Sequence, residues 1–138
     1  MSDLRFVFTH RLVVRFSDCD MMGHVNHTVY FTYLEQCRLT WWKSFGKTPG
    51  IGGVPTNIVH AECDYRAPAH VHDELEIGVT SVTLGRSSVT LGYQIRNVAT
   101  GQLLAEGKTV NVTLDRETLR PIPIPDVTRR LLSGESAA

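Results

Sequence analysis

A short polar segment early in the chain contains the residue types that acyl-transfer chemistry requires. Between positions 17 and 27 the sequence has two aspartates, Asp18 and Asp20, two histidines, His24 and His27, and one glycine, Gly23. Hydrolysis at an acyl carbonyl needs a carboxylate that attacks the carbonyl carbon or deprotonates a water. It also needs donors where negative charge develops on the carbonyl oxygen. The segment has no sustained apolar period, so we expect a loop.

A helix is expected directly after this loop. Apolar residues recur every three or four positions from about Thr28 to Phe45, Asn26 or a neighbour is available as a cap, and Gly46 and then Pro49 end the pattern. At about 1.5 Å per residue such a helix is roughly 27 Å long. Further aromatic residues lie off the main apolar stripe, so much of its circumference should be covered. We therefore expect a core helix.

The start of this helix is a candidate oxyanion site. The first N–H groups of a helix have no intrahelical acceptor and lie at the positive end of its dipole. Asp20 lies a few residues before them, and the backbone around Gly23 and His27 supplies candidate donors. We read Asp18 as a structural loop residue.

Three simpler or competing interpretations apply to the same residues. An aspartate before a helix is often a cap or a loop hydrogen bonder, which is the plain alternative for Asp20. The two histidines and neighbouring acids have irregular spacing, so we expect no metal site. Glu35, in the middle of the helix, must be solvated or paired, and Arg38 is its obvious partner.

A second candidate binding element begins a later strand. Arg86, Ser87 and Ser88 follow Gly85, where a guanidinium and two hydroxyls could meet the phosphate groups of a ligand. A strand arginine is more often simply solvated, which is the alternative here.

Period-two alternation predicts five strands. The first covers positions 6–16, with its even residues on one face, and four more follow the helix. The residues expected to share a face in these four strands are Val59, Ala61, Cys63 and Tyr65; Leu75, Ile77 and Val79; Val89, Leu91, Tyr93 and Ile95; and Leu104, Val110, Val112 and Leu114. A turn at positions 97–101 favours antiparallel pairing, and Asp126 could cap a short helix through Leu132 before a polar tail from about position 133. The fold class is therefore α+β, with one long helix across a curled sheet.

The sequence resembles a known family of enzymes. It is similar to hotdog-fold acyl-CoA thioesterases of the 4-hydroxybenzoyl-CoA thioesterase type over roughly residues 8–125. The likeness is carried by the runs Asp18–Tyr30 and Tyr33–Arg38, by Asp64–Arg66 and Gly85–Ser88, and by Pro121–Pro123. The resemblance implies one central helix wrapped by a five-stranded antiparallel sheet.

The resemblance also implies roles for individual residues. Asp20 matches the catalytic carboxylate of the family, and the His27 backbone N–H matches its carbonyl-polarising group. Another branch of hotdog thioesterases uses a helix carboxylate, so Glu35 is the alternative base. The expected reaction releases a free acid and coenzyme A without a metal or organic cofactor. Alternatives are a hotdog enoyl-CoA hydratase, which pairs an aspartate with a histidine such as His24, and a non-catalytic acyl-CoA sensor.

Composition excludes other classes. The 138 residues suffice for one domain, and 42% hydrophobic content is typical of a folded chain. With 14 basic and 14 acidic residues the net charge is zero, so nucleic acid and membrane surfaces are not expected partners. The first 15 residues lack the apolar run of a signal peptide, and three separated cysteines suggest reduced thiols, so we expect a cytoplasmic protein. An unpaired sheet edge predicts a homodimer or homotetramer.

Overall fold

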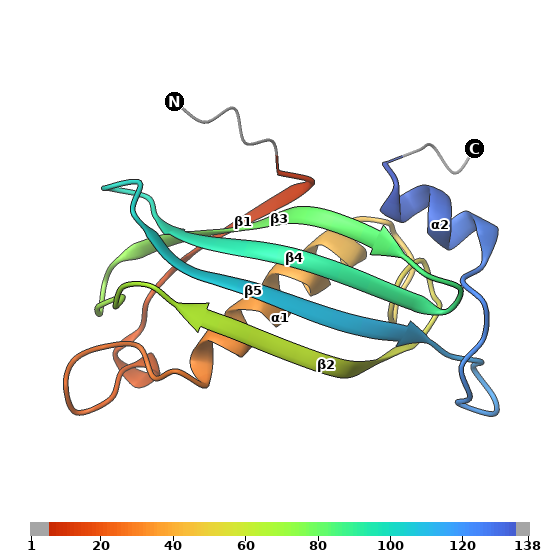
Figure 1. Cartoon of the computed structure of the whole chain (residues 1–138), viewed down its shortest axis with the longest axis horizontal. Coiled ribbons are helices and arrows are strands. Elements are labelled where there is room, and N and C mark those ends of the chain that lie inside the picture. Colours follow the sequence, from red (N-terminus) through yellow and green to blue (C-terminus); the bar gives the residue numbers. More distant parts are fainter. Residues whose placement is uncertain (1–5, 135–138) are drawn as a thin grey trace.

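The computed structural model describes residues 6–134. Along the chain it contains five strands, two α-helices and one short 3-10 turn (Figure 1): β1 (Phe8–Val13), the turn (Phe16–Asp18), α1 (Val29–Lys43), β2 (Thr56–Tyr65), β3 (Glu74–Leu84), β4 (Ser88–Asn97), β5 (Leu103–Thr113) and α2 (Asp126–Leu132). The expected α+β class, with five strands and one principal helix, is confirmed.

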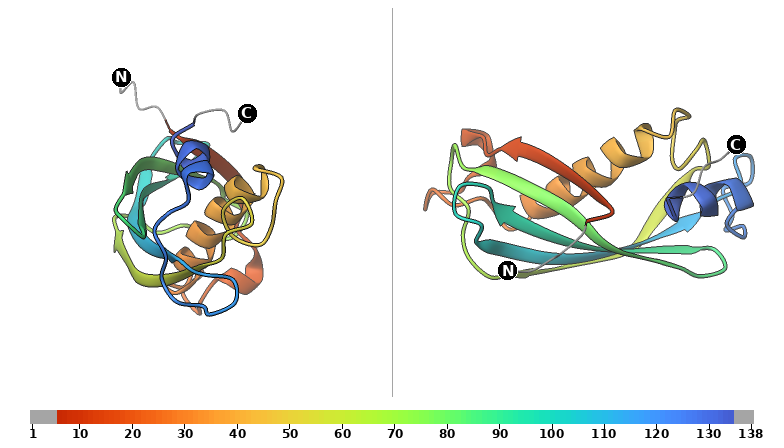
Figure 2. Two further views of the ribbon diagram at one scale, coloured as in Figure 1. Left: turned by 90° about the vertical axis from the view of Figure 1, so that its right-hand side faces the viewer. Right: turned by 90° about the horizontal axis from the view of Figure 1, so that it is seen from above.

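All five strands form one antiparallel sheet in the order β1-β3-β4-β5-β2. The sheet curls around α1, as the two perpendicular views in Figure 2 show. The predicted turn between β4 and β5 is present: the Asn97 side chain accepts hydrogen bonds from the N–H groups of Ala99 and Thr100. In this order β1 and β2 are the edge strands, and β2 pairs only with β5.

The core lies between the concave face of the sheet and α1. Alternation correctly predicted the inward residues of β3 and β4, which are buried: Leu75, Ile77 and Val79 in β3, and Val89, Leu91, Tyr93 and Ile95 in β4. Beyond a register shift between Val79 and Ser81, β3 is only partly buried. Leu34 and Cys37 of α1 are fully buried against this face. The helix approaches β5 so closely that a side-chain carbon at Gly107 would lie 2.7 Å from a Leu34 methyl, so a larger residue here would require Leu34 to shift.

Two predicted elements are shorter in the structure than the sequence suggested. The first strand ends at Val13, because the chain turns into the 3-10 segment and leaves Phe16 exposed. Helix α1 has 15 residues rather than about 18, and its cap residue is Thr28, whose N–H donates to the Asn26 side chain. Seven of the 15 residues are buried, in keeping with the expectation that much of the circumference is covered, and Leu39 on the open side is 50% exposed.

The face predictions for β2 and β5 were wrong in part. In β5 the inward residues are Thr109, Asn111 and Thr113, whereas Val110 and Val112 lie on the other face. The pairing of β4 with β5 shifts register between Ile95 and Arg96, opposite the start of β5. Beyond such a bulge, the residues that would have faced outward face inward instead. In β2, Val59 is 62% exposed and lies at a register shift between Ile58 and His60, where it has no partner on β5.

The C-terminal segment follows the prediction closely. Helix α2 has the predicted bounds, although Pro125 is the cap residue and Asp126 is the first helical residue. The expected polar tail lies outside the described residues from position 135 onward. Within residues 6–134 no helix is long and apolar enough to span a membrane.

Candidate active site

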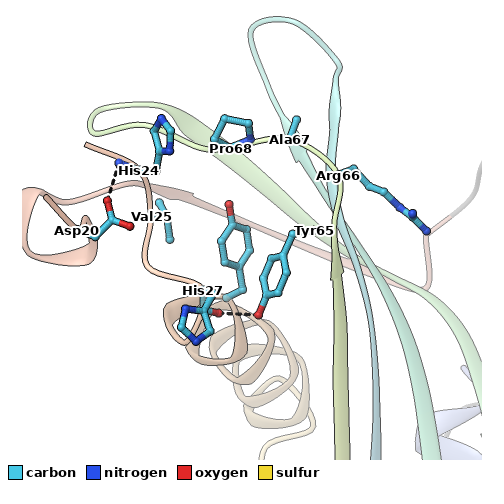
Figure 3. Close-up of a pocket in the computed structure, with 9 residues that line it drawn as sticks. Asp20, His24, Val25, His27, Tyr65, Arg66, Ala67 and Pro68 are labelled. Carbon is cyan, nitrogen blue, oxygen red and sulfur yellow. Dashed lines mark hydrogen bonds between the residues drawn. The ribbon is translucent and has the colours of Figure 1, made fainter. Parts of the chain in front are cut away.

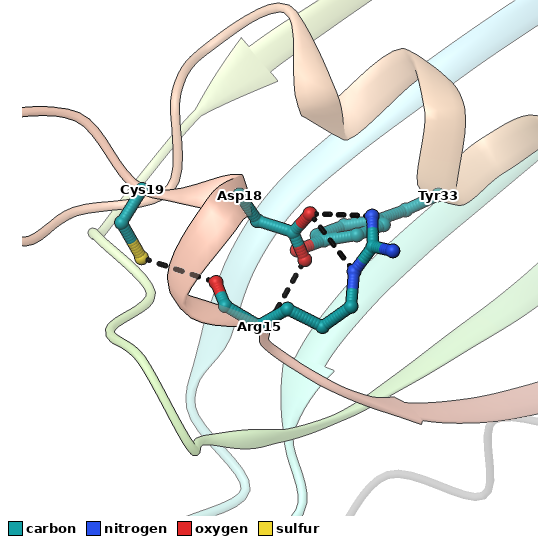
Figure 4. A network of polar contacts seen from close by, with 4 residues as sticks. All are labelled: Arg15, Asp18, Cys19 and Tyr33. Carbon is teal, nitrogen blue, oxygen red and sulfur yellow. Dashed lines mark hydrogen bonds and ion pairs between the residues drawn. The ribbon is translucent and has the colours of Figure 1, made fainter.

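A buried aspartate fixes the loop that precedes α1. The Asp18 carboxylate accepts hydrogen bonds from the Tyr33 hydroxyl at 2.8 Å, from the Arg15 backbone N–H at 3.0 Å and from the Arg15 guanidinium at 2.9 Å (Figure 4). Asp18 is buried, with 3% of its surface exposed. The expectation that Asp18 is structural is supported, since every recorded partner belongs to the loop entry or to α1.

The hydrogen bonds of Asp18 also determine its charge state. Burial alone would raise the pKa of this carboxyl. The hydrogen bonds from the Arg15 side chain and backbone and from Tyr33 outweigh that effect, so the pKa lies below its usual value. Asp18 is therefore ionised at neutral pH and attaches the loop to α1 through Tyr33.

Asp20 lies on the exposed part of the same loop. One carboxylate oxygen, Oδ1, accepts a 2.9 Å hydrogen bond from the Met22 N–H and a 3.4 Å hydrogen bond from the His24 N–H. No hydrogen bond to its second oxygen is recorded within residues 6–134. The local turn thus orients the side chain through one oxygen and leaves the other for chemistry.

Asp20 borders a pocket of about 370 Å³ at the N-terminal end of α1. Two parts of the chain line this pocket (Figure 3). The loop and helix start contribute Asp20, His24, Val25, His27 and Tyr30, and the end of β2 with the following segment contributes Tyr65, Arg66, Ala67 and Pro68. The tertiary structure therefore brings the expected carboxylate to a hollow that also contains the helix start.

The His27 backbone presents one free donor at this pocket. Neighbouring N–H groups are engaged: that of Asn26 donates to the Asp18 carbonyl, and that of Thr28 donates to the Asn26 side chain. For the His27 N–H no acceptor is recorded among the described residues. The Tyr65 hydroxyl donates a 2.8 Å hydrogen bond to the His27 carbonyl oxygen, so β2 holds this residue from the other side.

The other two loop candidates have different partners. The Gly23 N–H donates to the Asp20 carbonyl oxygen at 3.0 Å, and Gly23 has a φ of 78°, which suits a glycine in this turn. The His24 ring packs edge-on against the His70 ring, with centroids 4.9 Å apart. Gly23 thus shapes the turn, and His24 reaches Asp20 through its backbone.

Glu35 lies outside this pocket. Its carboxylate is 3.7 Å from the Arg38 guanidinium, which confirms the predicted pairing, and both residues face a groove between α1 and β2. The side chain of Arg38 is only 8% exposed, whereas that of Glu35 is 55% exposed.

The Arg86 segment lies at the far end of the sheet from Asp20. It forms the turn between β3 and β4, where Gly85 N–H donates to the Ser88 carbonyl and Ser87 carbonyl accepts from Thr113 N–H. The ends of β3 are roughly 33 Å apart for 11 residues. Within one chain, Arg86, Ser87 and Ser88 therefore do not join the Asp20 pocket.

Within residues 6–134 no group of three or more His, Cys, Asp or Glu side chains is arranged to hold a metal ion.

Tyr65 and Pro68 line the pocket but were not among the expected site residues. Tyr65 could have been suspected from its place at the end of a predicted strand, but its bond to His27 depends on the packing of β2 against the loop.

Comparison with known proteins assigns the family. The model of the thioesterase-like superfamily matches residues 14–132, which include α1, the whole sheet beyond the first strand and α2. The chain belongs to the thioesterase-like superfamily. This confirms the resemblance and makes the protein a hotdog-fold thioester hydrolase.

Individual relatives agree with this assignment. The chain is 35% identical to a 1,4-dihydroxy-2-naphthoyl-CoA hydrolase of Synechococcus sp. (strain CC9605), over 89% of this chain and 87% of that protein. It is 31% identical to a solved thioesterase from Thermus thermophilus complexed with coenzyme A and Zn, with a TM-score of 0.82 over 93% of this chain and 98% of that one. A 1,4-dihydroxy-2-naphthoyl-CoA thioesterase from Synechocystis, 22% identical, shares the fold with a TM-score of 0.81, covering 91% of this chain and 95% of that one.

Proposed function

We propose that this thioesterase hydrolyses acyl-CoA thioesters, with Asp20 as the reacting carboxylate and the His27 N–H as the oxyanion donor. The proposal rests on the observation that Asp20 and His27 line the same pocket. Asp20 keeps one oxygen without a recorded hydrogen bond, and His27 has a backbone donor without a recorded acceptor among the described residues. The coenzyme A in the related Thermus structure supports the substrate class.

The reaction needs both groups at one carbonyl. As the Asp20 oxygen attacks the thioester carbon, or removes a proton from a water that attacks it, negative charge moves to the carbonyl oxygen. The His27 N–H stabilises that charge, helped by the positive end of α1. Collapse of the intermediate breaks the C–S bond and expels coenzyme A as a thiolate, which takes up a proton. With Asp20 as nucleophile, water then hydrolyses the acyl-enzyme anhydride.

Tyr65 acts as a positioning residue in this scheme. Its hydroxyl bonds to the His27 carbonyl, and its ring packs edge-on against Tyr30, with centroids 5.0 Å apart. These contacts restrict the backbone at the start of α1, where the oxyanion donor must point at the substrate. The hydratase alternative has less support, because the His24 ring packs on His70 while its backbone N–H contacts Asp20.

The assembly that fits this site is a homodimer formed through β2. This ten-residue edge strand exposes Ile58 and Val59, which are 47% and 62% exposed, and an uncovered edge of that length favours pairing with another strand. A second copy of the chain supplies an identical edge, and antiparallel pairing about a two-fold axis satisfies both edges at once.

Such a dimer also gives the Arg86 turn a role. Antiparallel pairing of β2 with its copy places the Arg86 end of one protomer beside the Asp20 end of its partner. Arg86, Ser87 and Ser88 would then meet the phosphates of coenzyme A from across the interface. The backbone of this turn is held against α2 by the Arg129 guanidinium, which donates to the Gly85 carbonyl oxygen.

The direct test is hydrolysis of a panel of short, long and aromatic acyl-CoAs by the purified protein, followed through release of free thiol. We expect the unmodified protein to hydrolyse at least one class of acyl-CoA. An Asp20→Asn variant should hydrolyse the same substrate far more slowly. If no acyl-CoA in the panel is hydrolysed, the proposed function is wrong. Tight binding of acyl-CoA without thiol release would instead support the sensor alternative.

A further inference from the structure

A groove between α1 and β2 contains charged groups that the proposed reaction does not use. It holds two cavities of about 260 and 190 Å³. Glu35 and Arg38 of α1 line both cavities, and Ile58 of β2 faces them from the strand. A groove that served only for apolar packing would not need a guanidinium and a carboxylate in its wall.

The groove and the Asp20 pocket lie along one side of α1. His27 at the helix start, Phe31 and Glu35 follow one another at four-residue spacing, and Arg38 comes three residues later, so these residues share one stripe of the helix. His27 lines the Asp20 pocket, whereas Phe31, Glu35 and Arg38 line the larger cavity. The helix therefore forms one continuous wall from the pocket to the groove.

The strand β2 supplies the opposite wall in the same order. Tyr65 lines the pocket and Ala61 lines the larger cavity, and residues four apart lie on the same face of a strand. An acyl chain whose thioester lies at Asp20 and His27 can thus extend between helix and strand toward Arg38. Eleven helical positions from His27 to Arg38 correspond to roughly 16 Å along the axis. A helical side chain leans back toward the N-terminus, which shortens the span that the acyl chain must bridge.

The Arg38 guanidinium at the end of this path is buried and has few partners. Its side chain is 8% exposed, and its ion pair with Glu35 spans 3.7 Å, longer than a hydrogen bond. Arg38 also opposes the burial effect that raises the pKa of Tyr93, but the Tyr93 hydroxyl has its own hydrogen bond with Thr109 at 2.6 Å. No hydrogen bond of ordinary geometry from the five guanidinium N–H donors is recorded among the described residues. A buried cation of this kind gains from a ligand that accepts hydrogen bonds and carries negative charge.

Glu35 does not prevent such a ligand from binding. Its side chain is 55% exposed, so its attraction to Arg38 is weakened by water. A ligand carboxylate in contact with the guanidinium forms two parallel hydrogen bonds of about 2.7–2.9 Å, which are stronger than the present long contact. The exposed Glu35 side chain can turn toward solvent as the ligand enters. A hydrocarbon end would leave the buried donors of Arg38 without acceptors.

We infer that the preferred acyl group carries a second carboxylate at its far end, and that Arg38 binds this carboxylate while the thioester lies at Asp20. The inference rests on the proposed function and deepens it, because it assigns to Arg38 the selection of dicarboxylic monothioesters over ordinary fatty acyl-CoAs. A site that hydrogen-bonds one substrate group discriminates against analogues without that group, since its buried polar atoms are then left unpaired. All the residues involved belong to one chain, so the inference does not depend on the dimer.

The test compares acyl-CoAs of equal length that differ only at the far end. Hexanoyl-, octanoyl- and decanoyl-CoA are paired with adipoyl-, suberoyl- and sebacoyl-CoA, and kcat/KM is measured for each through release of free thiol. We expect at least one dicarboxylic thioester to exceed its matched partner by at least ~10-fold, as expected for hydrogen bonds between charged groups. The length with the largest ratio reports the span from Asp20 to Arg38.

Two substitutions should move this ratio in opposite directions. Arg38→Gln removes the cation and should reduce the ratio to about one, whereas Glu35→Gln removes the competing anion and should raise the ratio by about two- to fivefold. Arg38→Lys keeps the charge but loses the paired donors, so its ratio should be intermediate. The matched control is Arg11→Gln, which breaks the exposed ion pair with Glu76 between β1 and β3 and should keep the ratio of the unmodified protein.

Equal kcat/KM within every pair, measured on the unmodified protein, overturns this inference and leaves the proposed function standing. That comparison needs no variant, so it holds even where a substitution of the buried Arg38 prevents folding. A ratio that Arg38→Gln leaves unchanged, in a variant shown by thermal melting to be folded, also overturns the inference. So does hydrolysis of other acyl-CoAs with no turnover of any dicarboxylic thioester. Absence of hydrolysis across the whole panel, aromatic acyl-CoAs included, contradicts the proposed function instead.

Discussion

The Tyr65 hydroxyl donates a 2.8 Å hydrogen bond to the carbonyl oxygen of His27. This bond joins the end of the edge strand β2 to the loop that leads into α1, across 38 residues of sequence. The two rings also meet edge to face, with centroids 6.4 Å apart. The geometry of the helix start therefore depends on the position of an edge strand.

Tyr65→Phe should lower kcat by up to about tenfold, which corresponds to loss of roughly one hydrogen bond's net contribution. The variant keeps the ring contacts and removes only the hydroxyl, so KM should change little. Steady-state kinetics on the best acyl-CoA measures both parameters. A rise in KM with kcat intact would show that Tyr65 binds substrate and does not position the His27 backbone.

Asp20→Asn should reduce kcat by at least ~10²-fold while KM stays within a few-fold, because the substitution keeps the shape of the side chain and removes its charge. The retained Oδ1 can still accept the Met22 N–H, so the loop should remain folded. Matched variants are Glu35→Gln and His24→Ala, both expected within about tenfold of the unmodified enzyme. Loss of turnover in Glu35→Gln, with Asp20→Asn active, would assign the reaction to the helix carboxylate.

Arg86→Ala should raise KM for acyl-CoA several-fold with little change in kcat, the pattern expected when uniform binding is lost. The relevant charge is local, since the net charge of the chain is zero. A short acyl pantetheine thioester, which lacks the nucleotide phosphates, serves as the matched substrate and should show no difference between the two proteins. An unchanged KM for acyl-CoA would place the phosphate site elsewhere.

Val59→Glu should convert the dimer into single chains of 15.4 kDa and reduce activity. When the ten residues of β2 pair symmetrically, residue 59 lies opposite Glu62 of the partner subunit, so the substitution introduces two like-charge pairs across the interface. The control is Val127→Glu, at a similarly exposed valine on α2, which should leave the assembly intact. Light scattering after size exclusion measures the mass. A single-chain mass in a fully active unmodified sample would contradict the dimer.

Asp18 should contribute stability that acid removes. Its pKa is lower in the folded protein than the ordinary value of 3.8, so the contribution is present above about pH 4 and is lost as pH falls through the folded-state pKa. Asp18→Asn should lower the free energy of unfolding by ~1–3 kcal/mol at pH 7, as expected for loss of charged hydrogen bonds. Denaturant titrations from about pH 7 to pH 3 should show this difference shrinking in acid, and a difference that stays constant with pH would refute the assignment.

The fold class, the positions of β3 and β4, and the loop that carries Asp20 could be predicted from the sequence alone. One face of β4 and of the first half of β3 is buried, so the alternation of residues such as Ile77 and Leu91 reports burial directly. The loop could be recognised because its polar residues and Gly23 interrupt the apolar periods on both sides.

The inward face of β5 and the residues that complete the site depend instead on the packing of elements that are distant in sequence. The register shift near the start of β5 turns Asn111 toward the groove, and no local pattern encodes such a shift. Tyr65 likewise reaches His27 only because β2 folds back beside the start of α1. Alternation records whether a side chain is buried, but hydrogen-bond partners far apart in sequence are fixed by the packing of whole elements.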